Sequence, residues 1–204
     1  MIPRRLVRTV PEHTSDQAEA WWQQAVELHP GWDTETWREP VDPADFPLTG
    51  HLFATCESGA QKADLIRAER LFWVGGVYLD ADVVCLRSFD PLLGVRGFAA
   101  FEDADFVPNA VMGFEAGHPA MRRVIELAIQ RHDQGTWAAG VGVTTEVFRN
   151  DPTVLLLPPN SFYPVDWRTA HKMPIDVAKV AAANPWSYAI HLYHGSWKKQ
   201  PCAS

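Results

Sequence analysis

The amino-acid sequence predicts an α/β fold, in which helices flank an open, mostly parallel β-sheet. Three observations support this prediction. Segments with the two-residue period of strands alternate along the chain with segments of helical period. The strand-like segments are short, apolar and often bounded by proline or glycine, as buried strands are. A pair of aspartates lies in one of them, and ligands of such sheets bind beyond the carboxyl ends of the strands.

The chain begins with a strand-like segment and a helix. A strand is expected over 6–10, and Pro11 ends it because proline has no backbone donor to offer a neighbouring strand. A helix is expected over 14–28, where apolar residues recur at helical spacing until Pro30-Gly31. The segment 30–50 contains so many prolines and glycines that we expect an irregular connection there.

The next two elements are expected to position the chemistry. A helix is predicted over 61–73, and Gly75-Gly76 supplies the left-handed residues that end such a helix. A strand is predicted over 77–83, because apolar side chains alternate there with Tyr78, Asp80 and Asp82. An extended backbone would turn both carboxylates to the same side, roughly 7 Å apart.

The second half of the chain continues the alternation. A short strand is expected over 98–101, and a helix is expected to begin at Pro119. A buried strand is expected over 154–157, and a further alternating strand over 188–192. We find no internal repeat and expect a single domain over 1–204.

Composition limits the class of protein. The chain has 204 residues, 47% hydrophobic and 21% charged, which is typical of a globular protein with a sizeable core. It has no apolar run of about 18 residues and no signal-peptide core, so we expect a cytoplasmic location. A formal net charge of −7 disfavours nucleic-acid binding. The basic clusters Arg4-Arg5-Arg8 and Lys198-Lys199 leave a weak contact with an anionic membrane surface open.

Asp80-Ala81-Asp82 is the segment that points to chemistry. Two carboxylates between apolar neighbours are unfavourable together unless a cation or a positive side chain lies nearby. Oxygen ligands suit Mg²⁺ or Mn²⁺, which usually complete their shells with water and substrate phosphates. The pair therefore indicates a diphosphate site, although a bare D-x-D sequence can also cap a turn or face water.

The residues around this pair form a longer pattern. An Asp64-x-x-Arg67 helix leads through the Gly75-Gly76 turn into Tyr78-Leu79-Asp80-Ala81-Asp82. This pattern, within residues 62–86, resembles the sugar-binding DxD signature of the family-32 glycosyltransferases, which include yeast mannosyltransferases and bacterial capsular-polysaccharide transferases. The whole pattern is far more specific than a D-x-D sequence alone.

Both ends of the chain extend the resemblance. Ile2-Pro3, His29-Pro30-Gly31-Trp32 and Thr36-Trp37 are similar to the family's N-terminal pattern. The segment 191–197 is similar to its closing motif, a histidine a few residues before Ser-Trp. The similarity therefore covers nearly the whole chain.

The resemblance implies a GT-A fold, a UDP- or GDP-sugar donor, and Mn²⁺ or Mg²⁺ between the carboxylates and the donor diphosphate. Asp82 would bind the cation directly, and Asp80 would lie closer to the ribose and the outer shell of the metal. His194 is the expected third ligand, with His191 and Ser196 as rivals. Trp197 would act with the two aspartates in catalysis by stabilising the departing phosphate.

The resemblance also implies a set of donor-binding residues, which are Thr9, Asp64, Arg67, Gly76, Asn109 and Ser196. Three plainer interpretations stay open: Asp64 and Arg67 as a surface ion pair, Asn109 as a turn residue, and Trp197 as packing. Glu102 and Asp103 are candidates for a carboxylate near the reacting sugar. The segment 140–144 is similar to a family segment with proline in place of Val141, a difference that weakens an acceptor contact from Thr144.

These features together predict a metal-dependent glycosyltransferase that transfers a hexose, with retention of configuration, to a hydroxyl of a glycan or small-molecule acceptor, as in polysaccharide biosynthesis. A metal-dependent phosphohydrolase or nucleotidyltransferase is the enzymatic alternative, and the sequence has no Gly-rich phosphate-binding loop to favour it. A non-catalytic sugar-nucleotide-binding protein is the other alternative.

Overall fold

A computed structural model describes residues 1–170, 172 and 174–195, and two sheets organise it. The central six-stranded sheet has the order β2-β1-β3-β6-β5-β7, and β6 runs antiparallel to both of its neighbours. Its other pairs are parallel. The strands are β1 (Arg5–Val10), β2 (Asp33–Arg38), β3 (Gly76–Leu79), β5 (Gly97–Ala100), β6 (Val111–Phe114) and β7 (Val154–Leu157). A second sheet pairs β4 (Val83–Cys85) with β8 (Ala189–His191).

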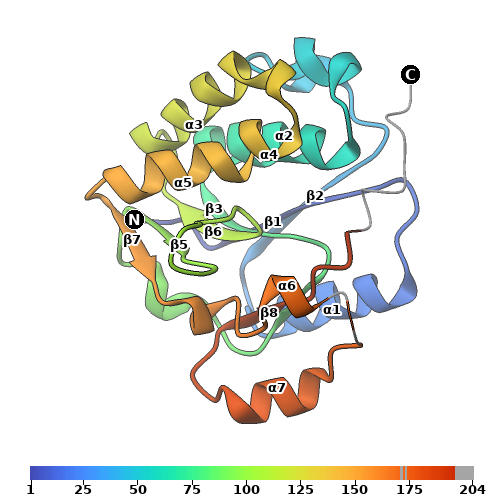
Figure 1. The fold of residues 1–204 in the computed structure, drawn as a ribbon, viewed down its shortest axis with the longest axis vertical. Coiled ribbons are helices and arrows are strands. Elements are labelled where there is room, and N and C mark those ends of the chain that lie inside the picture. The colour runs from blue at the N-terminus through green and yellow to red at the C-terminus, as the bar shows by residue number, and fades with distance from the viewer. Residues whose placement is uncertain (171, 173, 196–204) are drawn as a thin grey trace.

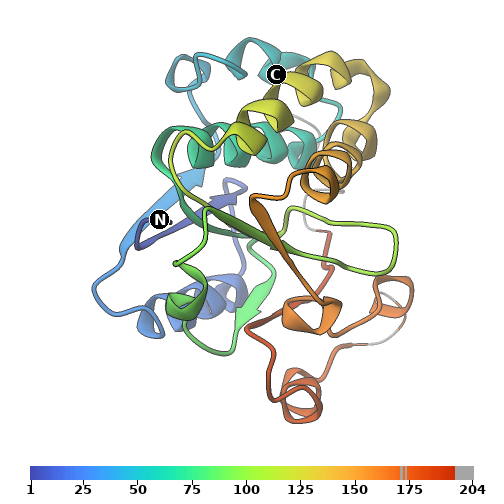
Figure 2. The same cartoon turned by 90° about the vertical axis from the view of Figure 1, so that its left-hand side faces the viewer.

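Helices lie on both sides of the central sheet, as Figures 1 and 2 show. One side has α2 (Gly59–Val74), α3 (Pro119–Gln130), α4 (Thr136–Ala139) and α5 (Val141–Asn150). The other side has α1 (Asp16–Glu27), α6 (Trp167–Ala170), α7 (Val177–Ala183) and the small sheet. Short 3₁₀ turns span Pro43–Asp45, Gly50–Thr55, Asp90–Leu92, His132–Gln134 and Pro159–Ser161. None of the helices in the described part of the chain is long and apolar enough to cross a membrane.

The four inner strands of the central sheet bury both of their faces, which explains their apolar sequences; they are β1, β3, β6 and β5. Leu6, Val77 and Leu79 belong to the core on the α1 side of the sheet. Val7 and Tyr78, which alternate with them, belong to the core beneath α2 and α3. A sheet covered on both faces is typical of α/β proteins, so the predicted α/β class and the mostly parallel sheet are confirmed.

Helix α2 has well-defined ends that fix where the next strand begins. Ser58 accepts a hydrogen bond from the backbone N–H of Gln61 and so caps the first turn. Gly75 ends the helix with a φ of +67°, and a Cβ at this position would lie 2.7 Å from the backbone nitrogen of Ala116. Strand β3 starts at Gly76 without any loop, close to the predicted boundary.

The predicted strand over 77–83 is wrong beyond Leu79. Strand β3 ends there, and the chain turns, with the backbone N–H of Val83 donating to the carbonyl oxygen of Asp80 at 3.1 Å. After the turn the chain enters β4, which pairs with β8 in the other sheet. Alternation of apolar and polar residues continues through this turn, so the pattern cannot show where the backbone leaves one sheet for another.

The predicted irregular connection over 30–50 is wrong in its first part. Strand β2 occupies Asp33–Arg38 and pairs in parallel with the whole of β1, with Arg5 opposite Asp33. It lies at the edge of the sheet, and several of its side chains are exposed. Its polar composition therefore lacks the apolar pattern that identifies buried strands.

His29, the first residue of the His29-Pro30-Gly31-Trp32 segment, has a structural role in the core. Its ring is buried just beyond α1, where Nδ1 donates to the carbonyl oxygen of Ala25 at 2.6 Å. Its Nε2 accepts from the backbone N–H of Phe89 at 2.9 Å, so the ring must be neutral to make both bonds. Burial lowers the pKa of His29, against the smaller raising effects of its bond to Ala25 and the charge of Asp90.

We expect His29 to make the free energy of unfolding depend on pH. The unfolded histidine, with a pKa of about 6.5, takes up a proton before the folded one does, so its contribution falls as pH drops below that value. His29→Leu should lose about 1–3 kcal/mol at pH 7.5, because the Phe89 N–H is left without its partner. Urea unfolding at pH values from 7.5 to 5 should show that the difference in free energy of unfolding between wild type and variant becomes smaller. A difference that stays constant would contradict a neutral, buried His29.

Candidate active site

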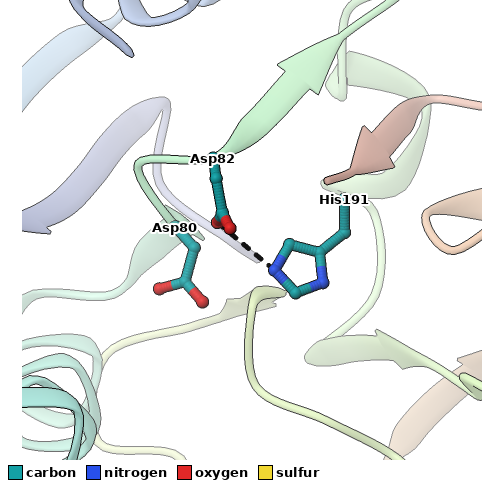
Figure 3. Close-up of side chains that lie close together, drawn as sticks. All are labelled: Asp80, Asp82 and His191. Carbon is teal, nitrogen blue, oxygen red and sulfur yellow. Dashed lines mark ion pairs between the residues drawn. The ribbon is translucent and has the colours of Figure 1, made fainter. Parts of the chain in front are cut away.

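The Asp80-Ala81-Asp82 turn lies at the carboxyl end of β3, in the middle of the central sheet. The backbone N–H of Asp80 donates to the carbonyl oxygen of Ala110 at 2.9 Å, which ties the turn to the segment before β6. Side-chain ligand atoms of Asp80, Asp82 and His191 all lie within 4.8 Å of one another (Figure 3). The turn therefore brings the carboxylates closer together than the extended strand that the sequence predicted.

Asp80 is held by one of its two oxygens. Its Oδ1 accepts from Arg67 Nη2 at 2.8 Å and from the Tyr78 hydroxyl at 2.8 Å. Within the described residues its Oδ2 has no hydrogen-bond partner. Burial raises the pKa of Asp80, the charge of Arg67 opposes this rise, and the charge of Asp82 adds to it.

Thr9 lies behind this aspartate. Its Oγ1 is 2.6 Å from the Tyr78 hydroxyl. Because the one hydroxyl proton of Tyr78 goes to Asp80, Thr9 is the donor in this pair. Thr9 is buried and does not line the cleft, so its predicted direct contact with the donor does not fit the structure. Its observed role is to orient Tyr78.

Asp82 is held from β8 and from the residues that follow it. Asp82 Oδ1 lies 3.3 Å from His191 Nε2, and Oδ2 accepts from the backbone N–H of His194 at 2.7 Å. Burial alone would raise the pKa of Asp82, but the charge and hydrogen bond of His191, with the His194 N–H, lower it to about 2. Asp82 is therefore ionised at neutral pH.

The structure places His191, and not the expected His194, with the two carboxylates. Antiparallel pairing of β4 with β8 sets His191 opposite Val83, directly beside Asp82. The His194 ring instead contacts Trp21, with a centroid distance of 5.4 Å, and lies outside the cluster of ligand atoms. The strand register, which spacing in the sequence cannot supply, decides between the two histidines.

Arg67 connects the Asp80-Ala81-Asp82 turn to two further polar side chains of the site, Asp64 and Asn109. Its Nη1 donates to Asn109 Oδ1 at 2.9 Å and lies 3.3 Å from Asp64 Oδ1. Asn109 Nδ2 in turn donates to Asp64 Oδ1 at 2.9 Å. The guanidinium is buried and lies 4.5 Å from the centre of the Tyr78 ring. Asp64 and Arg67 are thus part of a buried network, and the plainer interpretation as a surface ion pair is wrong.

Asp64 lies close to the backbone at Gly140, between α4 and α5. A Cβ on Gly140 would lie 2.1 Å from Asp64 Oδ2, so only glycine allows this contact. Burial raises the pKa of Asp64 to about 6; Arg67 opposes the rise, Asp80 adds to it, and the Asn109 hydrogen bond opposes it. The carboxyl group therefore lies in a desolvated environment beside its charged neighbours.

Two threonines position Asn109, and sequence reasoning did not find this role for them. Thr144 Oγ1 donates to the carbonyl oxygen of Val107 at 2.8 Å, and Thr145 Oγ1 accepts from the Val107 N–H at 3.0 Å. Both bonds fix the backbone two residues before Asn109. Thr144 is 2% exposed, so the structure gives it a supporting role and no contact with an acceptor.

Most of the polar side chains described above line one cleft of about 430 Å³. Its lining includes Asp64, Arg67, Asp80, Asp82, Glu102, Asn109, Trp137, His191 and Tyr193. Gly76 is not among them: it begins β3, at the opposite end of the strand from Asp80, so its predicted donor contact does not fit the structure. The predicted roles of Ser196 and Trp197 fall on residues outside the described part of the chain.

The donor set at the turn fits a divalent cation. Two carboxylates and one imidazole are ligands that Mn²⁺ accepts, and carboxylates also suit Mg²⁺. Among the described residues that line the cleft, four carboxyl groups accompany one arginine, Arg67, so an added positive charge would be favourable; the four belong to Asp64, Asp80, Asp82 and Glu102. His191 turns its Nε2 toward the carboxylates, 3.3 Å from Asp82 Oδ1, so this nitrogen is the one placed to reach a shared cation (Figure 3).

Comparison with known proteins relates this chain to glycosyltransferases. Residues 15–98 match the model of a family described as the glycosyltransferase sugar-binding region containing DXD motif. Inositol phosphoceramide mannosyltransferase 3 of Schizosaccharomyces pombe is 32% identical over 120 residues, which are 55% of this chain and 33% of that protein. Lactosylceramide 4-alpha-galactosyltransferase of Rattus norvegicus is 26% identical over 148 residues, which are 65% of this chain and 40% of that protein.

Solved structures agree in fold. The apo form of the glycosyltransferase GlyE from Streptococcus pneumoniae superposes with a TM-score of 0.59 at 11% identity, over 98% of this chain and 56% of that one. The expected GT-A fold is therefore confirmed. The chain spans only 33% and 40% of the length of the two curated relatives. Residues 15–98 therefore match the DXD-containing sugar-binding region of a glycosyltransferase family, and the resemblance to the family-32 glycosyltransferases is supported.

Proposed function

We propose that this protein is a metal-dependent glycosyltransferase that transfers a hexose from a nucleotide-sugar to an acceptor hydroxyl. The observation that supports this most is the convergence of Asp80, Asp82 and His191 in one cleft with Asp64, Arg67 and Asn109. The first three groups suit a cation and a diphosphate. The other three offer the charged and amide groups that recognise sugar hydroxyls.

Asp82, Asp80 through its Oδ2, and His191 would hold Mn²⁺ or Mg²⁺. When bound, the cation would neutralise charge on the diphosphate as the bond to the sugar breaks. The protein's own part is to keep these groups in place before the donor arrives. Arg67 and Tyr78 fix Asp80 by Oδ1, and the backbone of His194 fixes Asp82. Such preorganised polar groups are an efficient way to stabilise charge in a transition state.

The donor sugar would meet the network of Asp64, Arg67 and Asn109. Arg67 already donates to Asn109, Asn109 donates to Asp64, and Arg67 forms an ion pair with Asp64, so these three side chains are held together before binding. Asp64 Oδ2 has no hydrogen-bond partner among the described residues and can accept from a sugar hydroxyl. Since the carboxyl is desolvated, that bond would contribute more than it would in water.

We propose retention of anomeric configuration, and of the two carboxylates considered for the reacting sugar we favour Glu102. Glu102 lines the cleft. Asp103 instead caps its own loop, accepting from the backbone N–H groups of Asp105 and Phe106, and its other oxygen binds Arg168 at 2.8 Å. A carboxylate with its oxygens occupied in this way is poorly suited to attack.

The acceptor class is a proposal that rests on the relatives. Their names describe transfer of mannose to inositol phosphoceramide and of galactose to lactosylceramide. We therefore propose an acceptor hydroxyl on a glycan or glycolipid head group, with a small-molecule glycoside as the simplest substitute. A role in polysaccharide biosynthesis and a cytoplasmic location stay predictions.

A panel of nucleotide-sugars tests the proposal. GDP-mannose, UDP-galactose and related donors are incubated with the protein, with Mn²⁺, with Mg²⁺ or with EDTA, and the products are separated by mass spectrometry. One donor should release free sugar and nucleoside diphosphate, or transfer its sugar to an added glycoside, only when metal is present. Release of nucleoside monophosphate and sugar phosphate would indicate a phosphohydrolase, and metal-dependent binding without turnover would indicate a binding protein.

A further inference from the structure

One aromatic side chain of the cleft has no part in the chemistry proposed above. Trp137, on α4, lines the cleft and yet is 58% exposed. Thr136 and Val141 line the cleft beside it. A large apolar ring that stays in contact with water at the edge of a polar site is unfavourable in the free protein, and burial of its surface by a ligand would be favourable.

The indole is supported from behind by two neighbours. Phe106 packs edge-on against it, with ring centroids 5.6 Å apart and an interplanar angle of 86°. The backbone of α5 approaches it at Gly142, where a Cβ would lie 3.2 Å from Trp137 Cζ3. These contacts restrain the ring, so little side-chain entropy would be lost when a ligand packs on it.

The position of α4 relates this ring to the polar network. Helices α4 and α5 meet at Gly140, whose backbone contacts Asp64. Trp137 is therefore only three residues from the contact with the network of Asp64, Arg67 and Asn109. A pyranose has hydroxyl groups that bind polar side chains and an apolar C–H surface that packs on an aromatic ring. A wall with polar groups and an adjacent exposed aromatic ring offers both kinds of contact.

From this arrangement we infer that Trp137 is a stacking platform for a pyranose ring bound in the cleft. The inference rests on the proposed function and extends it, since it assigns a recognition residue. The sugar has two possible sources, the hexose of the donor and the terminal sugar of the acceptor, and they share the same stacking chemistry. Trp137 is then a specificity residue, and replacing its ring should weaken binding of that sugar more than it slows the chemical step.

The test compares Trp137→Ala, Trp137→Phe and Trp186→Ala. Trp186 is the matched control, because it is 78% exposed, packs near Arg87 and does not line the cleft. Donor hydrolysis without acceptor gives the KM of the donor, and transfer at saturating donor gives the KM of the acceptor. Circular dichroism and thermal melting of each variant establish that it is folded.

Trp137→Ala should raise one of these KM values at least tenfold, Trp137→Phe should raise it less, and Trp186→Ala should leave both unchanged. A raised donor KM identifies the donor hexose as the stacked ring, and a raised acceptor KM with unchanged donor KM identifies the acceptor sugar. Turnover by wild type with both KM values unchanged in Trp137→Ala would overturn this inference alone. No turnover by wild type with any donor would overturn the proposed function, and this inference with it.

Discussion

Asp82→Asn should lower kcat/KM for donor hydrolysis by about 1,000-fold or more, which corresponds to about 4 kcal/mol of transition-state stabilisation. Asp82 is ionised, with its pKa lowered to about 2, so the substitution removes a full negative charge from the proposed cation site. The amide keeps the size of the side chain, and its oxygen can still accept the His194 N–H. Loss of activity should therefore occur without loss of the fold, and steady-state kinetics with circular dichroism measure both.

His194→Ala is the matched control for this prediction. Its ring is removed, but the backbone N–H that donates to Asp82 remains. We expect kcat/KM to change by less than about threefold, whereas His191→Ala should reduce it strongly. A loss in His194→Ala as large as that in Asp82→Asn would instead support His194 as the third ligand.

Arg67→Met should lower the free energy of unfolding by about 3–5 kcal/mol, because it leaves buried carboxylates without their cation. The guanidinium contacts Asp80 at 2.8 Å and Asp64 at 3.3 Å, and its side chain is 4% exposed. Methionine has similar length and is apolar, so lost packing contributes less than lost charge and hydrogen bonding. Urea unfolding at neutral pH measures the change.

Two further variants distinguish the loss of the buried Arg67 charge from a general loss of stability on substitution of an arginine. Arg122→Met removes an exposed ion pair with Glu126 on α3, and it should cost less than about 1 kcal/mol. Adding Asp80→Asn to Arg67→Met removes one of the stranded charges and should restore part of the lost stability. A cost below 1 kcal/mol for Arg67→Met alone would show that the network does not depend on this cation.

The sequence was most informative where local chemistry determines structure. The positive φ of Gly75 is a local property, so the end of α2 and the start of β3 could be predicted closely, whereas α2 begins at Gly59, two residues before the predicted start. The Asp80-Ala81-Asp82 motif could also be placed at a strand end. The turn inside it could not, because it depends on Leu79 ending the central sheet while Val83 pairs with β8.

Other differences have the same origin in long-range pairing. His191 and His194 both looked suitable in the sequence, and only the register of β8 against β4 sets His191 beside Asp82. Thr9 lies in a strand that the sequence identifies correctly. Its side chain does not reach the cleft, because the Tyr78 hydroxyl lies between Thr9 and Asp80. Strand β2 was missed because a polar edge strand has little of the apolar alternation by which strands are recognised.

The central claim is that the cluster of Asp80, Asp82 and His191 holds a cation that in turn holds a nucleoside diphosphate. Thermal melting with UDP or GDP, in Mn²⁺ and in EDTA, tests it most directly. One nucleotide should raise the Tm in Mn²⁺ only, by an amount equivalent to about 2.7 kcal/mol at a hundredfold excess over its Kd, and Asp82→Asn should abolish the rise. An equal rise in EDTA, or an unchanged rise in Asp82→Asn, would contradict the account.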